Sequence, residues 1–140
     1  MPWLQGAPDP VTTGTWDTWV EVNSKQAQEL GLKEGDIVSL ESATGTIEAL
    51  VYPSPAAPPN VLAIPFGQGH KAYGRWAQAR GANAFKVLDT KTDKQSGALA
   101  WGATRVKMTA TGRWRRVPKM EGSVVPRQLP HEPVIQVTKG

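Results

Sequence analysis

Apolar and polar residues alternate along three short segments in the first half of the chain, at 19–22, 37–40 and 46–52. An alternation with a period of two is typical of strands that bury one face. The last two segments flank the turn Ala43-Thr44-Gly45 and therefore predict a hairpin. In its second strand, the same alternation places three apolar side chains on one face, those of Ile47, Ala49 and Val51.

A short helix is predicted between the first strand and the hairpin. Asn23 is a good N-cap, and Gln26 stands three residues later, where a capping box places Glu or Gln. Ala27 and Leu30 give the segment an apolar side, and Gly31 suits the left-handed position that ends a helix. The sequence therefore specifies both ends of a helix of about two turns.

The rest of the chain is rich in proline and glycine and predicts loops with a few strands. Segment 53–60 holds four prolines and is expected to be a stiff crossover that does not pair as a central strand. The uninterrupted apolar run 61–66 predicts a short strand that is buried on both faces. Residues 67–83 predict a long glycine-containing loop with mild helical character at 72–79.

The last strand region is expected at 98–101 and 104–108, with a turn at 110–112 that leads into 113–117. These elements predict three parts: an irregular N-terminal arm over 1–18, a β domain over 19–117, and an extended Pro-rich tail over 118–140. Within the tail, 134–137 has the pattern of an edge strand.

Composition narrows the chemistry that the chain can carry. Its 140 residues include no cysteine, which excludes thiolate zinc sites, iron–sulfur clusters and disulfides. The two histidines give no metal site with recognisable ligand spacing. No apolar run approaches the roughly 20 residues that span a bilayer, and the first residues lack the pattern of a signal peptide. A soluble domain without membrane insertion of its own is expected.

The net charge is +4, and the basic residues concentrate late in the sequence, at Arg105, Lys107, Arg113, Arg115, Arg116, Lys119 and Arg127. Basic strands that carry a tryptophan, here Trp114, can indicate nucleic-acid binding. We interpret this charge as a solvated or partner-facing strand instead, and predict no nucleic-acid partner.

Several motifs in a fixed order together resemble one known domain. Leu30-Gly31-Leu32-Lys33-Glu34-Gly35-Asp36 follows the strand at 19–22, and the later motifs are Gly45-Thr46-Ile47-Glu48-Ala49, the apolar run 61–65, Gly67-Gln68-Gly69-His70 and Gly81-Ala82-Asn83. This order resembles the molybdopterin-dinucleotide-binding domain, the C-terminal part of the large molybdopterin oxidoreductase family. The blocks 96–101 and 104–106 are similar to the polysulfide-reductase-like branch and to the related iron–sulfur subunit of alternative complex III.

The resemblance covers about residues 16–108 and implies a mainly β fold. That fold is a six-stranded double-psi β-barrel with one or two short helices, here with an extended C-terminal arm. The family's barrel normally has a strand before Pro2-Trp3-Leu4, and its catalytic domains supply the metal ligand and the iron–sulfur cysteines. These 140 residues contain neither, so we expect a part of a longer protein or a subunit that another chain completes.

The glycine-rich loop is the candidate binding site. A pterin dinucleotide carries a pyrophosphate, a fused polar ring system and a guanine, and glycines let backbone N–H groups approach such a ligand closely. Arginines suit phosphate, and Gln, His and Asn can read ring edges. The predicted cofactor-binding residues are Gly67, Gln68, Gly69, His70, Arg75, Arg80, Gly81 and Asn83. By resemblance, 68–70 and 81–83 match the family's cofactor-facing loops; the alternative is a surface loop whose glycines only allow turns.

The predicted function is that of a molybdopterin guanine dinucleotide-binding domain or subunit of a molybdopterin-dependent oxidoreductase. The chain is expected to have no catalytic residues and no metal ligands, and not to be an enzyme by itself. Its expected partners are catalytic molybdopterin and iron–sulfur domains or subunits, with membrane association only through a complex. One alternative is a structural barrel module of a membrane-associated respiratory complex that binds no molybdopterin. Another is a free-standing barrel that serves as an adaptor.

Overall fold

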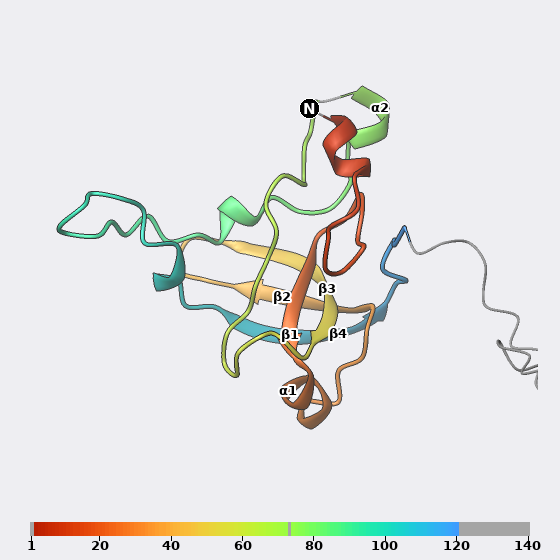
Figure 1. Cartoon of the computed structure of the whole chain (residues 1–140), viewed down its shortest axis with the longest axis horizontal. Helices are drawn as coiled ribbons and strands as arrows, with labels where there is room; N and C mark the ends of the chain where they lie inside the picture. The colour runs from red at the N-terminus through yellow and green to blue at the C-terminus, as the bar shows by residue number, and fades with distance from the viewer. Residues whose placement is uncertain (1, 73, 121–140) are drawn as a thin grey trace, which may run out of the picture.

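The computed structural model describes residues 2–72 and 74–120. These residues form one four-stranded mixed sheet, with the strand order β1-β3-β2-β4. The strands are β1 (Trp19–Asn23), β2 (Asp36–Glu41), β3 (Thr46–Ser54) and β4 (Lys107–Trp114). The helical elements are short: α1 (Ser24–Glu29), α2 (Gly74–Ala77) and the 3₁₀ turns η1 (Pro2–Gly6), η2 (Ala84–Lys86) and η3 (Trp101–Ala103). Figure 1 shows α1 beyond one end of the sheet and α2, with η1 beside it, beyond the other.

The predicted mainly β class is confirmed, whereas the described residues do not form the six-stranded double-psi barrel. β1 pairs in parallel with β3, and β2 pairs antiparallel with both β3 and β4, which leaves an open sheet. At the β1 edge, Glu21 and Ala63 exchange backbone hydrogen bonds of 2.8 and 3.3 Å. That single bridge stands where a further strand would be needed to close a barrel.

Two faces of the sheet bury apolar side chains. Ile47, Ala49 and Val51 of β3 join the main core, together with Val20, Val22, Val38, Leu40, Ala27, Ala84 and Val87. This confirms the predicted alternation along the second hairpin strand. On the opposite face, Leu50 packs with Trp19 and Val117. The sheet is therefore sandwiched between a larger core and a smaller one, and the first of these supports η2.

The helix α1 has the ends that the sequence specifies. The Asn23 side-chain oxygen accepts hydrogen bonds from the N–H groups of residues 25 and 26, at 3.1 and 3.3 Å. At the other end, Gly31 adopts a positive φ of 67°, and its N–H and that of Leu32 bond back into the helix in the Schellman pattern. The capping box is incomplete, because the Gln26 amide pairs with Asn60 across the proline segment at 2.6 and 2.9 Å.

Four local predictions were wrong. The expected last strand region does not form at 98–101 or 104–106, where the chain has an isolated bridge at Leu99 and the turn η3, and β4 begins only at Lys107. β3 continues through Pro53 and Ser54, which is tolerated because β2 pairs with β3 only as far as Leu50. Segment 61–66 is not a strand buried on both faces: Leu62 and Ile64 pack on the core, whereas Val61, Ala63 and Phe66 are exposed. The expected turn at 110–112 is a bulge inside β4, where Gly112 has a φ of 73° and Thr111 donates its hydroxyl to the Ile37 carbonyl at 2.7 Å.

The end of the N-terminal segment is tied to the rest of the chain, because Gly14 lies against the Trp19 ring of β1 and the Thr15 N–H donates to the Pro118 carbonyl at 2.9 Å. The segment carries η1, which was not predicted, and a turn in which Asp9 accepts three hydrogen bonds from Val11 and Thr12. The bond from the Thr12 N–H is the largest cause that lowers the pKa of Asp9. Gly14 then bridges Lys119. The boundaries at 18 and 117 stay predictions, and the predicted edge strand at 134–137 lies outside the described residues.

Candidate functional site

Two loops of the glycine-rich segment cross at backbone-to-backbone distance. The first loop begins at Gly67, and the second runs from Ala79 to Asn83. The Gly69 N–H donates to the Arg80 carbonyl at 2.9 Å, and the Ala79 N–H donates to the His70 carbonyl at 3.2 Å. Gly69 has a φ of +81°, and a Cβ on it would lie 2.2 Å from the Asn83 nitrogen. Only glycine fits there, because any side chain would force the two backbones apart.

The crossing is fastened to the start of the sheet by Thr18. The Thr18 hydroxyl accepts a hydrogen bond from the Ala82 N–H and donates one to the Ala82 carbonyl, both at 2.9 Å. Gly81 lies against the same residue, and a Cβ on it would meet the Thr18 hydroxyl oxygen at 2.7 Å. Thr18 directly precedes β1, so the position of both loops is fixed by the sheet.

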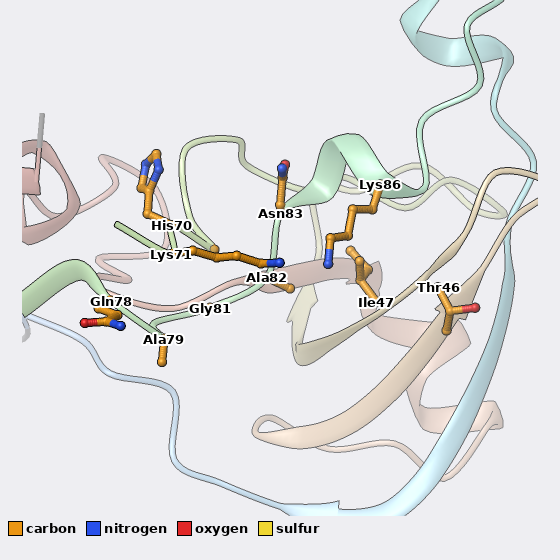
Figure 2. Close-up of a pocket in the computed structure, with 11 residues that line it drawn as sticks. Thr46, Ile47, His70, Lys71, Gln78, Ala79, Gly81, Ala82, Asn83 and Lys86 are labelled. Atoms are coloured by element: carbon orange, nitrogen blue, oxygen red, sulfur yellow. The ribbon is translucent and has the colours of Figure 1, made fainter. Parts of the chain in front are cut away.

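A cavity of about 540 Å³ lies between these loops, the start of β3 and η2. β3 supplies Thr46 and Ile47, and η2 supplies Lys86 (Figure 2). The two loops supply Gly69, His70, Lys71, Gln78, Ala79, Gly81, Ala82 and Asn83. Its volume lies within the range of about 300–1,000 Å³ that is usual for small-molecule sites. The cavity is open to solvent.

The lining of this cavity is basic and has no acidic residue. Lys71 and Lys86 line it from different elements, and no Asp or Glu is among its lining residues. In Figure 2 the side chain of Lys71 runs towards Ala82, and that of Lys86 bends towards the same part of the cavity. Within residues 2–72 and 74–120, neither ammonium group has an ion pair. The cavity therefore favours an anionic ligand.

The structure brings together half of the predicted site residues. Those that line this cavity are Gly69, His70, Gly81 and Asn83. Gly67 is exposed, and its carbonyl accepts from the Gln5 amide at 2.9 Å. Gln68 lies beneath the crossing, with a buried side-chain oxygen that has no hydrogen-bond partner in the part of the chain that is described.

The two predicted arginines lie elsewhere. Arg75 is exposed on α2, and its guanidinium carbon lies 4.8 Å from the ring centroid of Trp76. Arg80 lines a neighbouring cavity of about 330 Å³, together with Trp16, Asp17, Trp76, Ala79, Gly81, Arg115 and Pro118. The chain turns through a left-handed residue at Ala79, with a φ of 58°. In that second cavity, Arg115 forms an ion pair with Asp17: a guanidinium nitrogen lies 2.7 Å from an oxygen of the nearly buried carboxylate.

Asn83 has a structural role as well as a place in the cavity. Its side-chain oxygen accepts from the Phe85 N–H at 3.1 Å and so caps η2. Its amide nitrogen is the group that can face a ligand. The imidazole of His70 is directed away from the lysine side chains in Figure 2. The cavity thus lies at the predicted loops, and its lining includes four polar residues that were not predicted: Thr46, Lys71, Gln78 and Lys86.

An apolar groove of about 810 Å³ lies beside η2. At its rim, the rings of Phe66 and Phe85 are stacked with centroids 4.6 Å apart, and Trp101 lies 5.2 Å from Phe66. All three side chains are about half exposed. Phe66 directly precedes Gly67 and Phe85 follows Asn83 by two residues, so this aromatic cluster is continuous with the loops of the basic cavity.

Two kinds of feature are absent from residues 2–72 and 74–120. No group of three or more His, Cys, Asp or Glu residues could hold a metal ion there. None of the helices in that part of the chain is both long and apolar enough to cross a membrane.

Comparison with known proteins gives a consistent result. Residues 9–104 match the model of the molydopterin (molybdopterin) dinucleotide binding domain. The molybdopterin-containing subunit of the arsenate respiratory reductase of Chrysiogenes arsenatis is 34% identical over 98 residues, which are 64% of this chain and 12% of that subunit. The molybdopterin-binding-like subunit of the menaquinone reductase of Nitratidesulfovibrio vulgaris is 28% identical over 90 residues, 64% of this chain and 13% of that subunit.

The fold is similar to part of a solved structure, that of acetylene hydratase from Pelobacter acetylenicus. The TM-score is 0.52 at 22% identity, over 66% of this chain and 14% of the hydratase. The chain thus spans about an eighth of the length of the relatives that it matches.

Proposed function

Because the chain belongs to the molybdopterin dinucleotide binding domain family, we propose that it holds the nucleotide cofactor of a molybdopterin-dependent oxidoreductase. The cofactor would be molybdopterin guanine dinucleotide. The observation that carries this proposal is the basic cavity between the two crossed loops. Its polar lining groups come from four segments, namely the two loops, β3 and η2, and no acidic residue is among them. The hydrogen bonds of Thr18 hold the loops to the start of the sheet.

The residues present fit such a group. Its phosphates need positive charge, which Lys71 and Lys86 offer, and its polar rings need amide and hydroxyl groups, which Asn83, Gln78 and Thr46 offer. When bound, the cofactor supplies the redox chemistry. The residues of this chain position the nucleotide and balance its charge. We infer that the chain does not catalyse a reaction alone, because its cavity is open to solvent.

The opposite wall would come from the catalytic portion of the same molybdopterin protein. The arsenate reductase subunit is about eight times as long as the matched region, which leaves room for such a portion in that relative. The aromatic cluster of Phe66, Phe85 and Trp101 lies next to the cofactor loops, where a second wall over the cavity would also cover it. The strands that complete a double-psi barrel, the iron–sulfur partners and association with a membrane complex belong to the same proposal.

The test is cofactor content in the assembled protein, expressed from the complete natural reading frame. Asn83→Asp keeps the oxygen that caps η2 and adds a negative charge to the cavity. It should lower the molybdopterin content per polypeptide by about tenfold or more, since the new charge faces a phosphate-bearing ligand. Arg75→Ala is the matched control, because Arg75 lines neither cavity and should leave the content unchanged. Equal content in both variants and the parent would refute the proposed site.

A second candidate is a barrel module that has kept the fold without the cofactor. The menaquinone reductase relative, which is named a molybdopterin-binding-like subunit, favours this alternative. The complete reading frame separates the two. An upstream portion with a metal-ligating Cys, Ser or selenocysteine supports cofactor binding, whereas its absence supports the structural module. The polysulfide-reductase-like branch is a finer assignment that the same sequence would decide.

A further inference from the structure

Two backbone amides of the crossed loops are already used in hydrogen bonds within the chain. The Gly69 N–H donates a hydrogen bond to the Arg80 carbonyl, and the Ala82 N–H donates one to the Thr18 hydroxyl. Neither amide is free to bind a phosphate. The glycines at 69 and 81 are needed because the backbones touch at those positions. The predicted arginines lie outside the cavity. Formal positive charge at the cavity therefore comes from side chains other than the predicted arginines.

Lys71 and Lys86 are the lysine side chains that line this cavity, and no arginine is among its lining residues. They come from two different segments, the first loop and η2, and their side chains converge over Ala82 (Figure 2). Two ammonium groups directed into one cavity repel each other, and no acidic lining residue offsets that repulsion. A doubly charged anion placed between them would convert the repulsion into two charge-assisted hydrogen bonds.

We propose that Lys71 and Lys86 form a diphosphate-binding pair, which receives the pyrophosphate that joins the two halves of a dinucleotide. This inference rests on the proposed function and deepens it, because it assigns the phosphate contacts to two lysines rather than to the arginines or the loop amides. The cavity has room for more than a diphosphate, at about 540 Å³. Thr46 and Gln78 at its border then remain for the neighbouring parts of the ligand.

The experiment is an NMR titration of the ¹⁵N-labelled 140-residue chain with inorganic pyrophosphate, GDP, guanosine and inorganic phosphate. Pyrophosphate and GDP should shift the amide signals of the cavity residues with millimolar affinity, and more tightly than phosphate. Lys71→Gln and Lys86→Gln should each weaken pyrophosphate binding by about three- to tenfold, and the double variant should abolish it. Lys71→Arg and Lys86→Arg should restore most of the affinity, since they keep the charge.

Lys25→Gln is the matched control. Lys25 is exposed on α1, at the opposite end of the molecule from α2, so its loss changes the net charge equally without touching the cavity (Figure 1). An equal weakening in this variant would overturn the lysine pair, because it would show a general charge effect. So would the absence of any shift at the cavity residues in tens of millimolar pyrophosphate.

The failure of this inference can be told apart from the failure of the proposed function. If GDP and guanosine shift the cavity signals equally, and the glutamine variants bind GDP as the parent does, the lysine pair is wrong and the cavity still binds a nucleotide. If the assembled protein also contains no cofactor, the proposed function itself is wrong. Binding of phosphate and pyrophosphate with equal affinity would overturn the pair as a diphosphate site.

Discussion

The crossing of the two loops at Gly69 allows a quantitative test of how the site is built. Gly69 and Gly74 lie in the same segment and have nearly the same backbone conformation, with φ values of +81° and +77°. They differ in their surroundings. A Cβ at Gly69 would lie 2.2 Å from the Asn83 nitrogen and 2.5 Å from the Ala82 carbonyl carbon, whereas a Cβ at Gly74 would meet nothing within 4 Å.

Alanine at either position carries the penalty of a left-handed conformation, about 1–2 kcal/mol. Alanine at Gly69 must in addition push the backbones apart by about 0.8 Å to reach a tolerable separation of 3.0 Å. That movement strains the hydrogen bond from the Gly69 N–H to the Arg80 carbonyl, which contributes about 1 kcal/mol. We therefore expect Gly74→Ala to lower the free energy of unfolding by about 1–2 kcal/mol, and Gly69→Ala by about 3–5 kcal/mol.

Urea unfolding measures the global loss, and hydrogen exchange of the Ala82 amide measures the local one. That amide donates to the Thr18 hydroxyl, so it should exchange faster in Gly69→Ala and at the parent rate in Gly74→Ala. If the loop contact is lost without global unfolding, the Ala82 amide should exchange faster while the free energy of unfolding falls by less than the expected loss of about 3–5 kcal/mol. Equal stability losses together with an unchanged exchange rate of Ala82 would refute the account of the crossing.

Three further predictions concern the scaffold. Asn23→Ala should lower the free energy of unfolding by about 1 kcal/mol in a urea titration, because α1 loses its N-cap; no change would mean that the cap is dispensable. Leu40→Ala should lower it by about 2–5 kcal/mol, because Leu40 is fully buried in the main core, and a loss below 1 kcal/mol would contradict that burial. The pKa of Asp9 is lowered in the folded chain by the Thr12 N–H, so its contribution to stability is present above the unfolded value of about 3.9 and is lost as the pH falls through the lower folded value. Asp9→Asn should therefore reduce the difference in stability between pH 7 and pH 3, and identical pH profiles would count against that role.

Local signals in the sequence predicted the local structure well. Asn23 and Gly31 specify the ends of α1 through contacts within a few residues, and both act as predicted. The hairpin of β2 and β3 follows from alternation around a turn. Gly112 was taken for a hairpin turn and is a bulge instead, because β4 is held along its length by β2, a partner about 70 residues earlier in the chain. No local pattern contains that pairing.

Prediction of the candidate site from the sequence was limited in the same way, because no local pattern contains its long-range contacts. The glycines at 69 and 81 were singled out for amide contacts to a ligand, whereas the structure gives them a packing reason that depends on Asn83 and Thr18. Lys86 was missed because an exposed lysine in a polar segment looks like any solvated lysine until a cavity is seen beside it. Arg80 was included on chemistry alone, and the left-handed turn before it directs it to another cavity.

Most of the residues that line the cavity fall in one part of the sequence, between Gly69 and Lys86, and this part lies outside the four strands. Selection for ligand binding therefore acts mainly on this part of the sequence, and selection for folding acts mainly on the sheet. Substitutions in this stretch could erode ligand recognition while the sheet, with its own two cores, went on folding, and a lineage could thus lose its prosthetic group and keep the module as an architectural part. By the same reasoning, grafting this stretch together with Thr18 onto a related sheet should transfer recognition as a unit.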